Sequence, residues 1–556
     1  MNRDISKLNS KSYDVLVIGA GIAGAAVALD AAQRGLAVLI VDKGDFGSAT
    51  SASSGKIIHG GIRFMQHAAF LRVRESLHHR RVFLNIAPHL VHPIPFIIPT
   101  YGHGIKGKEI LTAGMMVYEL LGIDKNITKD PSKKVPRFKI LSKEEVLKLE
   151  PGINSDGLTG GVLYYDCQMH TPERLTLAII QTAKENGAEV FNYVKVNSLI
   201  TEKNNVIGAE LVDLLSGDII KINSLYTINA AGPWLNKILD MVPSTKAMKQ
   251  IQFSKGIHLV TEPITKNHAI ALATKHQQAK SILTRGGRHF FIAPWKKLSL
   301  IGTTNVNFNG DQDDKMVTKE DIEEFLDEIK QVYKPADRIT LKDVRYSYGG
   351  LYIDDANIKF ISGYQGHRND QILDHQEQDK INRLLSVIAV KYTTSLQLAE
   401  KIIDLIVKRL GKGNVKSVLE YQPLFGGDII DYSKFVKNAK NKYSDKLEEV
   451  IIENLILLHG TKYEEVINIG SSNNCLFEKF DEESPYIKAQ ILYSIKFEMA
   501  VKLSDVFLRR IGLGTLKKPE DVTIETVANI MAEELLWDNE RIQLEIDEVN
   551  SIYALN

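Results

Sequence analysis

A βαβ pattern near the N-terminus constrains the fold of this chain more than any other feature. The apolar run Val15–Ile18 has the composition of a buried parallel strand, and an alanine-rich helical pattern follows it. Gly19, Gly21 and Gly24 follow the first run with the spacing GxGxxG. A second apolar run ends at Asp42. Strand, helix and acidic residue in this register predict a dinucleotide-binding unit.

Each position of this motif has a physical role. Gly19 permits a tight turn, Gly21 lets the backbone approach a pyrophosphate at the helix N-terminus, and Gly24 allows close packing of the helix on the strand. Asp42 is placed to accept a hydrogen bond from a ribose hydroxyl. The alternative is a glycine-rich turn with no ligand, but such a turn requires neither the flanking strands nor the acidic residue.

The composition is that of a globular protein with more than one domain. The chain has 556 residues, and at about 150 residues per domain we expect roughly two to four domains. The 69 basic and 68 acidic side chains nearly cancel, and no basic run is interleaved with aromatic residues. Nucleic-acid binding is therefore not expected.

Cysteine usage and hydropathy bear on the compartment. Cys167 and Cys475 are the only cysteines, which is too few for a disulfide framework or a thiolate metal site. We therefore expect a reducing compartment, namely the cytoplasm, and we expect no bound metal. The first residues lack the apolar core of a signal peptide, and no run of about 18 uncharged apolar residues occurs. Membrane contact is expected only as a peripheral one on the inner face of the cell membrane. The apolar segment 110–122 fits a buried core helix better than an amphipathic surface helix.

Two further segments are rich in small residues. Residues 47–61 are small and polar and lead through a glycine pair to Arg63. Such residues allow backbone N–H groups to lie along phosphate and cofactor oxygens, with a flexible surface loop as the alternative. The apolar run Tyr226–Ala230 ends in the sharp turn 231–233, which we expect beside the nucleotide-binding unit.

Six motifs together resemble a known family. They are GAGIAGAAVALDAAQRG, SGKIIHGGIRF, APHLVHPIPFIIPTYG, INAAGPW, PWKKLSLIGTTNVNFNGD and EMAVKLSDVFLRRIGLG, and they extend from about residue 10 to about residue 520. In content and order they resemble the FAD-dependent glycerol-3-phosphate dehydrogenase family of the aerobic type. This family lies within the wider fold of FAD-dependent amine and hydroxy-acid oxidoreductases.

The resemblance implies a fold class of α/β plus α+β. A Rossmann-like FAD-binding domain would be interleaved with an antiparallel-sheet substrate domain within residues 1–400, and a helical C-terminal domain would follow at 401–556. The implied FAD-binding segments are about 10–100, 160–235 and 345–400, and the substrate-domain segments are about 100–160 and 236–345.

The resemblance also implies an activity. The reaction would be oxidation of sn-glycerol 3-phosphate, a phosphorylated polyol, to dihydroxyacetone phosphate by hydride transfer to flavin N5. Electrons would then pass to a quinone or to oxygen. FAD is expected to be bound noncovalently, and the sequence leaves the acceptor and the oligomeric state open.

The chemistry requires a group that takes the hydroxyl proton and cations that hold the phosphate. By motif match, the resemblance assigns the first role to His258 and the second to Arg63, Arg368 and Lys391. The alternatives are a structural histidine on a strand and solvated surface charges. The implied cofactor contacts are Gly19, Gly21, Gly24, Asp42, Lys43, Thr50, Ser51, Ser54, Lys56, His59, Gly60, Gly61, Ala231, Gly232, Lys391, Thr393 and Thr394.

The chain departs from the family pattern at several positions. Tyr352 stands where the family has an arginine that helps to hold the substrate, and Arg345 is a nearby candidate to replace that charge. Ala389 and Val390 replace two glycines, and Leu396 stands where arginine is common. A lost charge-assisted hydrogen bond is worth about 1.5–3 kcal/mol, enough to weaken binding or to admit another substrate.

Three functional hypotheses follow. The first is the flavoenzyme just described, and a related enzyme acting on another hydroxy or amino compound belongs with it. The second is an NAD-dependent dehydrogenase, which would share only the opening motif. The third is a divergent flavin-binding protein without this activity.

The C-terminal portion has a helical pattern. A helix is expected to stop at Gly411, and Pro423 with the glycines after it marks the start of a separate domain. The segment 491–514 predicts one long helix, with Arg509 and Arg510 as structural residues near its end.

Overall fold

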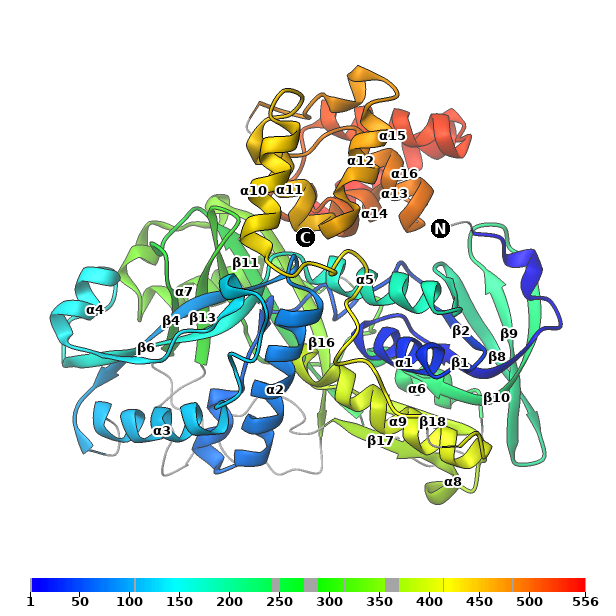
Figure 1. Ribbon diagram of the computed structural model, residues 1–556, viewed down its shortest axis with the longest axis horizontal. Coiled ribbons are helices and arrows are strands. Elements are labelled where there is room, and N and C mark those ends of the chain that lie inside the picture. Colours follow the sequence, from blue (N-terminus) through cyan, green and yellow to red (C-terminus); the bar gives the residue numbers. More distant parts are fainter. Residues whose placement is uncertain are drawn as a thin grey trace.

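The structure, a computed structural model, has two β-sheets side by side and a layer of helices across one end (Figure 1). It describes residues 3–104, 107–242, 251–274, 289–314, 316–355, 370–413, 415–482 and 484–555. The predicted fold class is confirmed, since a nucleotide-binding unit, a largely antiparallel sheet and a helical C-terminal domain are all present. The domain boundaries stay a prediction.

The first sheet has a parallel centre, as a βαβ unit requires. Strand β1 pairs in parallel with β2 on one side and β10 on the other, and β18 and β7 extend the parallel part. Its eight strands are β17 (Gln371–Asp374), β18 (Leu384–Ile388), β10 (Ile219–Asn229), β1 (Ser12–Ile18), β2 (Val38–Val41) and β7 (Glu189–Phe191), with β8 (Val194–Glu202) and β9 (Asn205–Asp213) joined to β10.

Three helices pack together against this sheet. Helix α1 (Ile22–Gln33) lies between α5 (Pro172–Glu185) and α9 (Ser395–Leu410), and almost every residue of α1 is buried. The alanines of α1 leave little side-chain volume between these helices, so the three helices approach one another closely. Helix α9 ends at a left-handed Gly411, as predicted.

The glycine motif sets the distance between α1 and β1. Gly19 has φ of +102°, and a Cβ atom there would lie 2.6 Å from the carbonyl oxygen of Ala230. A Cβ atom at Gly24 would lie 1.9 Å from the carbonyl oxygen of Gly19. Glycine at both positions is therefore a steric requirement of this helix–strand contact.

The second sheet is antiparallel apart from the β4·β12 pair. It draws strands from widely separated parts of the chain, so the two sheets are interleaved in sequence. Its ten strands are β15 (Val306–Phe308), β11 (Ile251–Thr261), β14 (Leu298–Gly302), β13 (His289–Trp295), β12 (Ala269–Ala273), β4 (Val91–Tyr101), β6 (Leu158–Met169) and β3 (Ile57–Ile58), with β16 (Val344–Asp355) on β11 and β5 (Lys139–Leu141) on β6.

Helices surround the second sheet and join it to the first. They are α2 (Phe70–Ile86), α3 (Lys108–Leu121), α4 (Lys143–Leu149) and α7 (Lys319–Lys330), and the short helices α6 (Leu235–Leu239) and α8 (His375–Gln378) lie by the first sheet.

The expectation of a buried core helix at 110–122 is wrong. In α3 only Met115 and Tyr118 are buried, whereas Met116 and Leu120 are 61% and 69% exposed. The helix packs on α2 and β6 along one narrow stripe, so its remaining apolar side chains face outward. Among the described residues, no helix has the length and apolar content needed to cross a bilayer.

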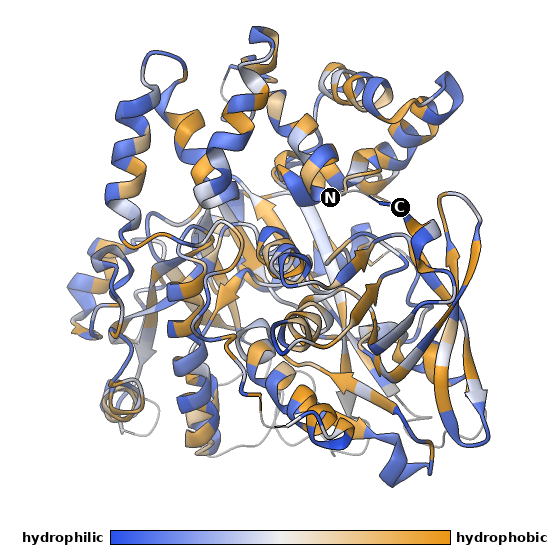
Figure 2. Cartoon of the chain, turned by 45° about the vertical axis from the view of Figure 1, so that its right-hand side comes forward, coloured by the Kyte–Doolittle hydropathy of each residue, from blue (hydrophilic) through white to orange (hydrophobic). Residues whose placement is uncertain are grey.

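The C-terminal helices pack around apolar clusters of their own, and polar and apolar residues alternate along them (Figure 2). They are α10 (Tyr432–Tyr443), α11 (Glu449–His459), α12 (Tyr463–Gly470), α13 (Ala489–Glu498), α14 (Leu503–Asp505), α15 (Asp521–Leu535) and α16 (Asn539–Tyr553).

The prediction of one long helix over 491–514 is wrong. Helix α13 ends at Glu498 because Met499 adopts a left-handed backbone with φ of +57°, and a π-helical turn follows at Val506–Arg510. The break places Arg509 and Arg510 against Asp45, with N···O distances of 2.6–2.8 Å.

This buried ion cluster joins the C-terminal domain to the nucleotide-binding unit. Burial opposes ionisation of Asp45, but the guanidinium groups of Arg510 and Arg509 hold the pKa of its carboxyl well below the usual range. Both arginines are thus structural, as predicted from the sequence.

We expect Gly24→Ala to lower the free energy of unfolding by about 1–3 kcal/mol, because the added methyl group forces α1 away from β1. Chemical denaturation measures the change. Gly114→Ala is the control, since Gly114 lies in α3 with no atom within 4 Å of an added Cβ, and it should leave stability equal or slightly higher. Equal losses in the two variants would contradict the steric role of Gly24.

Candidate active site

A cavity of about 590 Å³ opens at the C-terminal ends of β1, β2 and β10. This is where parallel α/β sheets bind ligands. Of the residues predicted to contact a cofactor, eight line it: Gly19, Gly21, Asp42, Lys43, Thr50, Ser51, Ala231 and Gly232.

Asp42 holds the glycine turn in place. Its carboxylate oxygens accept hydrogen bonds from the backbone N–H groups of Ala20 and Gly44, at 2.6 and 2.8 Å. Burial raises the pKa of Asp42 to about 6. Each carboxylate oxygen has a second acceptor position, so Asp42 can also accept from a hydroxyl group in the cavity.

The small-residue segment 47–61 begins as a wall of this cavity and is not a free surface loop. Ser51 Oγ accepts the N–H of Ile22 at the start of α1, at 2.9 Å. Thr50 Oγ1 donates to the carbonyl oxygen of Leu351 in β16, at 2.7 Å. The segment therefore crosses the N-terminus of α1 and ties it to the second sheet.

Trp234 also lines the cavity, although no role was predicted for it from the motif INAAGPW. Its Nε1 donates to Asp313 at 2.8 Å, and the ammonium group of Lys43 lies 4.1 Å above its ring. Lys43 also pairs with Asp313, at 2.5 Å. The signal in the sequence was the turn INAAGPW, which places an aromatic ring directly after the strand end.

The later part of segment 47–61 is held by buried charges. Lys56 forms a buried ion pair with Glu173 at 3.1 Å, so its charge is already matched. The N–H of Gly60 donates to Asp166 Oδ1 at 2.8 Å, and Arg80 pairs with the same oxygen at 2.6 Å. No motif in the sequence predicts this pairing, because Arg80 and Asp166 lie far apart in the chain.

His258 is buried on β11. Its ring stacks on Tyr348 with centroids 5.0 Å apart, and its Nδ1 has no hydrogen-bond partner in the described part of the chain. Burial, with a contribution from Lys56, lowers the pKa of His258 to about 3, so the imidazole is neutral at physiological pH. A neutral imidazole with an unshared nitrogen can accept a proton.

A glycine makes room for this imidazole. A Cβ atom at Gly302, the cross-strand neighbour of His258, would collide with its ring. Gly55 faces His258 Nε2, with its virtual Cβ position 3.5 Å away. The ring therefore lies between β14 and the segment that lines the cavity.

Lys391 and Arg63 lie in one electropositive region around His59. Burial, together with the charges of Lys391 and Arg63, lowers the pKa of His59 to about 3. Lys391 donates to Ser76 Oγ and lies 4.6 Å above the ring of Phe64. Burial lowers the pKa of Lys391 to about 8.

Arg63 donates to the carbonyl oxygen of His289 at 3.2 Å, so the second sheet holds its guanidinium group. Arg368, the remaining predicted cation, lies outside the described residues.

The turn before α9 is fixed by Asp370. Its carboxylate accepts the N–H of Val390 and the hydroxyl of Thr394, both at 2.7 Å. Thr393 donates to the carbonyl oxygen of His59 at 3.4 Å. Asp370 was missed as a site residue because the resemblance directs attention to the arginine two positions earlier.

Nine predicted cofactor contacts do not line the cavity of about 590 Å³. These residues lie within α1, in the later part of segment 47–61, or in the turn before α9. They are Gly24, Ser54, Lys56, His59, Gly60, Gly61, Lys391, Thr393 and Thr394.

The structure shows the surroundings of two residues that depart from the family pattern, Tyr352 and Leu396. Tyr352 lines the cavity, and its hydroxyl donates to Asn305. Leu396 is buried in the core around α1. Arg345 lies near the other end of β16 and pairs with Glu262, so the idea that it replaces the missing charge is wrong.

The model of the FAD dependent oxidoreductase family matches residues 14–370. This chain belongs to that family. The model of the C-terminal domain of alpha-glycerophosphate oxidase matches residues 417–542. An NAD-dependent dehydrogenase is thereby set aside.

Similar proteins cover the whole chain. A glycerol-3-phosphate dehydrogenase of Synechocystis is 31% identical over all of this chain and 98% of its own length. An aerobic glycerol-3-phosphate dehydrogenase of Staphylococcus haemolyticus is 29% identical over 96% of this chain and 93% of its own. The solved structure of a glycerol-3-phosphate dehydrogenase from Bacillus halodurans complexed with FAD has a TM-score of 0.76 at 25% identity, covering 99% of this chain and 96% of that one.

FAD is the cofactor of this family, and the cavity fits it. Gly21 presents backbone without a side chain at the N-terminus of α1, and Asp42 stands at the end of β2. Larger side chains at Gly19 or Gly24 would close the turn between them. These are the features that a dinucleotide pyrophosphate and ribose require.

We expect Asp42→Ala to weaken FAD binding about 10–100-fold, because the N–H groups of Ala20 and Gly44 lose a charged acceptor. Titration of the apoprotein with FAD, followed by quenching of flavin fluorescence, measures the affinity. Asp14→Ala is the control, since Asp14 accepts the N–H of Ala37 at the opposite end of β1. Equal losses in the two variants would mean that Asp42 acts on stability alone.

Proposed function

We propose that this protein oxidises sn-glycerol 3-phosphate to dihydroxyacetone phosphate. The observation that carries the proposal is the match of the whole chain to relatives named glycerol-3-phosphate dehydrogenase, which are matched over nearly their whole length. The match of residues 417–542 to the C-terminal domain of alpha-glycerophosphate oxidase supports the same substrate.

When bound, FAD would supply the hydride acceptor, with a quinone or oxygen as the final electron acceptor. Gly19, Gly21, Asp42 and Ser51 would hold it at the N-terminus of α1. The remaining steps fall to side chains of this protein.

His258 would take the proton of the C2 hydroxyl group. Its imidazole is neutral because burial keeps its pKa at about 3, and stacking on Tyr348 fixes the plane of the ring. A positioned base of this kind contributes about 10²–10⁴-fold to a rate.

Arg63, Arg368 and Lys391 would bind the phosphate. The guanidinium group of Arg63 suits bidentate contact with phosphate oxygens, and Lys391 acts as a point charge. Phe64 packs against Lys391 and keeps its ammonium group away from water.

A peripheral location on the inner face of the cell membrane is part of this proposal. A second cavity of about 560 Å³ is lined mainly by apolar residues of α3 and the second sheet, and apolar side chains of α3 are exposed beside it. These features support contact with a lipid surface, where a quinone acceptor dissolves.

A second candidate function rests on Tyr352. Tyr352, which is hydrogen-bonded to Asn305, stands where the family has a phosphate-binding arginine. The alternative substrate is therefore a hydroxy or amino compound with less negative charge.

Anaerobic stopped-flow absorption of the FAD-loaded protein tests the proposal. Glycerol 3-phosphate should bleach the flavin bands, and His258→Asn should slow the bleaching about 10²–10⁴-fold. His268→Asn is the control, because His268 is paired with Glu150 on the second-sheet side and should leave the rate unchanged. No bleaching of the FAD-loaded wild type would favour the second candidate, and an unchanged rate in His258→Asn would remove it as the base.

Lys391 predicts a pH dependence. Its ammonium form prevails below pH 8 and is lost as pH rises through about 8, so kcat/KM for glycerol 3-phosphate should fall over that range. In Lys391→Arg the charge persists to higher pH, and the fall should vanish. A fall that persists unchanged in Lys391→Arg would assign it to another group.

A further inference from the structure

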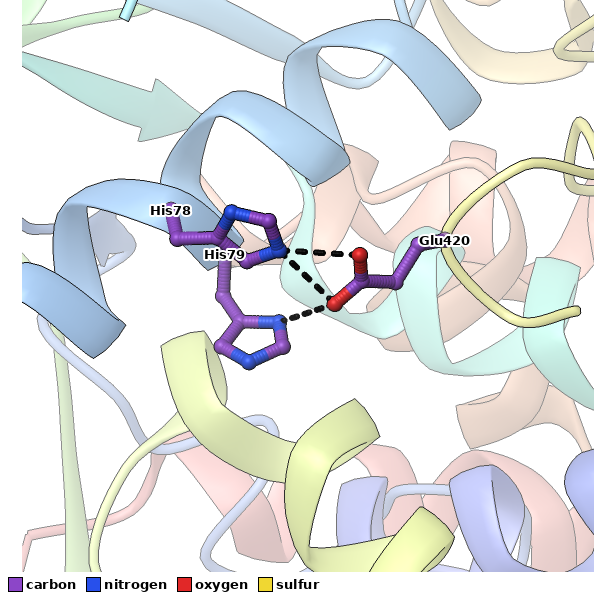
Figure 3. Close-up of side chains that lie close together, drawn as sticks. All are labelled: His78, His79 and Glu420. Carbon is purple, nitrogen blue, oxygen red and sulfur yellow. Dashed lines mark hydrogen bonds and ion pairs between the residues drawn. The ribbon is translucent and has the colours of Figure 1, made fainter. Parts of the chain in front are cut away.

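A cluster of two histidines and a glutamate lies apart from the residues assigned above. His78 and His79 are consecutive on α2, and Glu420 lies in the segment between α9 and α10. Figure 3 shows both imidazole rings turned toward the carboxylate of Glu420. One ligand atom from each of the three residues lies within 4.8 Å of the others.

The contacts of the two histidines with Glu420 are unequal. His78 Nε2 lies 2.8 Å from both carboxylate oxygens, which is a hydrogen-bond distance. His79 Nδ1 lies 3.8 Å from Oε1, which is too long for a hydrogen bond.

His79 has an unsatisfied nitrogen. The residue is 3% exposed, and its Nδ1 has no hydrogen-bond partner in the ranges that the structure describes. A buried imidazole nitrogen that has no hydrogen-bond partner in these ranges and faces a carboxylate oxygen 3.8 Å away is placed to share a cation with it.

The surrounding space can hold an ion and further ligands. A cavity of about 230 Å³ is lined by His78, His79 and Glu420 together with Glu75, Glu400 and Gln397. Burial raises the pKa of Glu400, and the charges of Asp404, Asp30 and Glu420 raise it further.

Two arginines near the cluster, Arg74 and Arg81, are paired with Asp124. Arg74 forms two hydrogen bonds with Asp124, at 2.6 and 3.0 Å, and Arg81 lies 3.3 Å from the same carboxylate. Asp124 thus takes up much of their charge.

We propose that His78, His79 and Glu420 bind one divalent transition-metal ion of the Zn²⁺ type, which ties α2 to the segment that leads into the C-terminal domain. Two imidazole nitrogens and a carboxylate are ligands of Zn²⁺ and its neighbours, whereas Mg²⁺ and Ca²⁺ prefer oxygen ligands only. Water would complete the coordination.

The second ring nitrogen of His78 also has polar neighbours. Arg81 Nη2 donates to His78 Nδ1 at 3.0 Å. Asp124 Oδ2 lies 3.8 Å from the same nitrogen, so a carboxylate stands where it can orient the metal ligand.

The test of this site does not depend on the proposed reaction. The site is measured by metal binding and not by turnover, so failure of one proposal is distinguishable from failure of the other. On α2, His78 and His79 follow Ser76, which accepts the hydrogen bond of Lys391, by two and three residues. The ion would therefore fix the helix that carries this contact.

Equilibrium dialysis of the full-length, FAD-loaded and chelator-treated protein against Zn²⁺, with metal analysis, tests the proposal. The wild type should bind one equivalent of Zn²⁺ at micromolar concentration. His79→Gln and Glu420→Gln should each weaken this binding at least about tenfold. His103→Gln is the control, because His103 and Glu109 form an exposed pair at 3.3 Å, and it should bind as the wild type does.

Two results would overturn the proposal: no bound Zn²⁺ in the wild type, or equal binding in the wild type and both cluster variants. The flavin-to-protein ratio and far-UV circular dichroism show whether each variant is folded. Glu420→Gln replaces a partly exposed side chain by one of the same size, so it tests the site even where His79→Gln fails to fold. A rise in Tm with Zn²⁺ in the wild type and not in Glu420→Gln gives a second readout.

Discussion

The close contact between α1 and β1 is the constraint on which the rest of the site depends. Gly24 lies against the carbonyl oxygen of Gly19, and Gly19 lies against the carbonyl oxygen of Ala230, the residue that follows the neighbouring strand β10. Because no side chain fits between them, the N-terminus of α1 reaches the ends of β1 and β10. The cavity, the position of Asp42 and the path of segment 47–61 all follow from this approach.

Buried charges then connect the site to distant parts of the chain. Asp45 lies in the segment that follows Asp42 and pairs with Arg509 and Arg510 of the C-terminal domain. Removing one partner of such a buried cluster leaves an uncompensated charge, which costs about 3–5 kcal/mol. The C-terminal domain therefore supports the wall of the cavity as well as its own core.

Burial also sets the protonation of the proposed reaction groups. His258 is neutral because its surroundings exclude water, and the amine of Lys391 has a lowered pKa for the same reason. The two pKa shifts have different consequences. A neutral imidazole can accept a proton, whereas a lysine must stay charged to bind an anion. One physical effect thus keeps the imidazole of His258 uncharged and sets the pH above which the amine of Lys391 loses its charge.

The sequence by itself determined the nucleotide-binding unit, the mixed fold class and the family, because these depend on local patterns such as strand, glycine spacing and helix. It did not determine where α13 ends, since a left-handed Met499 has no signal in residue type, nor that α3 is exposed, since apolar spacing does not show what covers a helix. Only the tertiary structure decided the pairing of Asp166 with Arg80 and the meeting of His78 with Glu420, 342 residues apart. Such contacts depend on how whole elements pack, and side chains brought together in this way leave no spacing in the sequence from which they can be predicted.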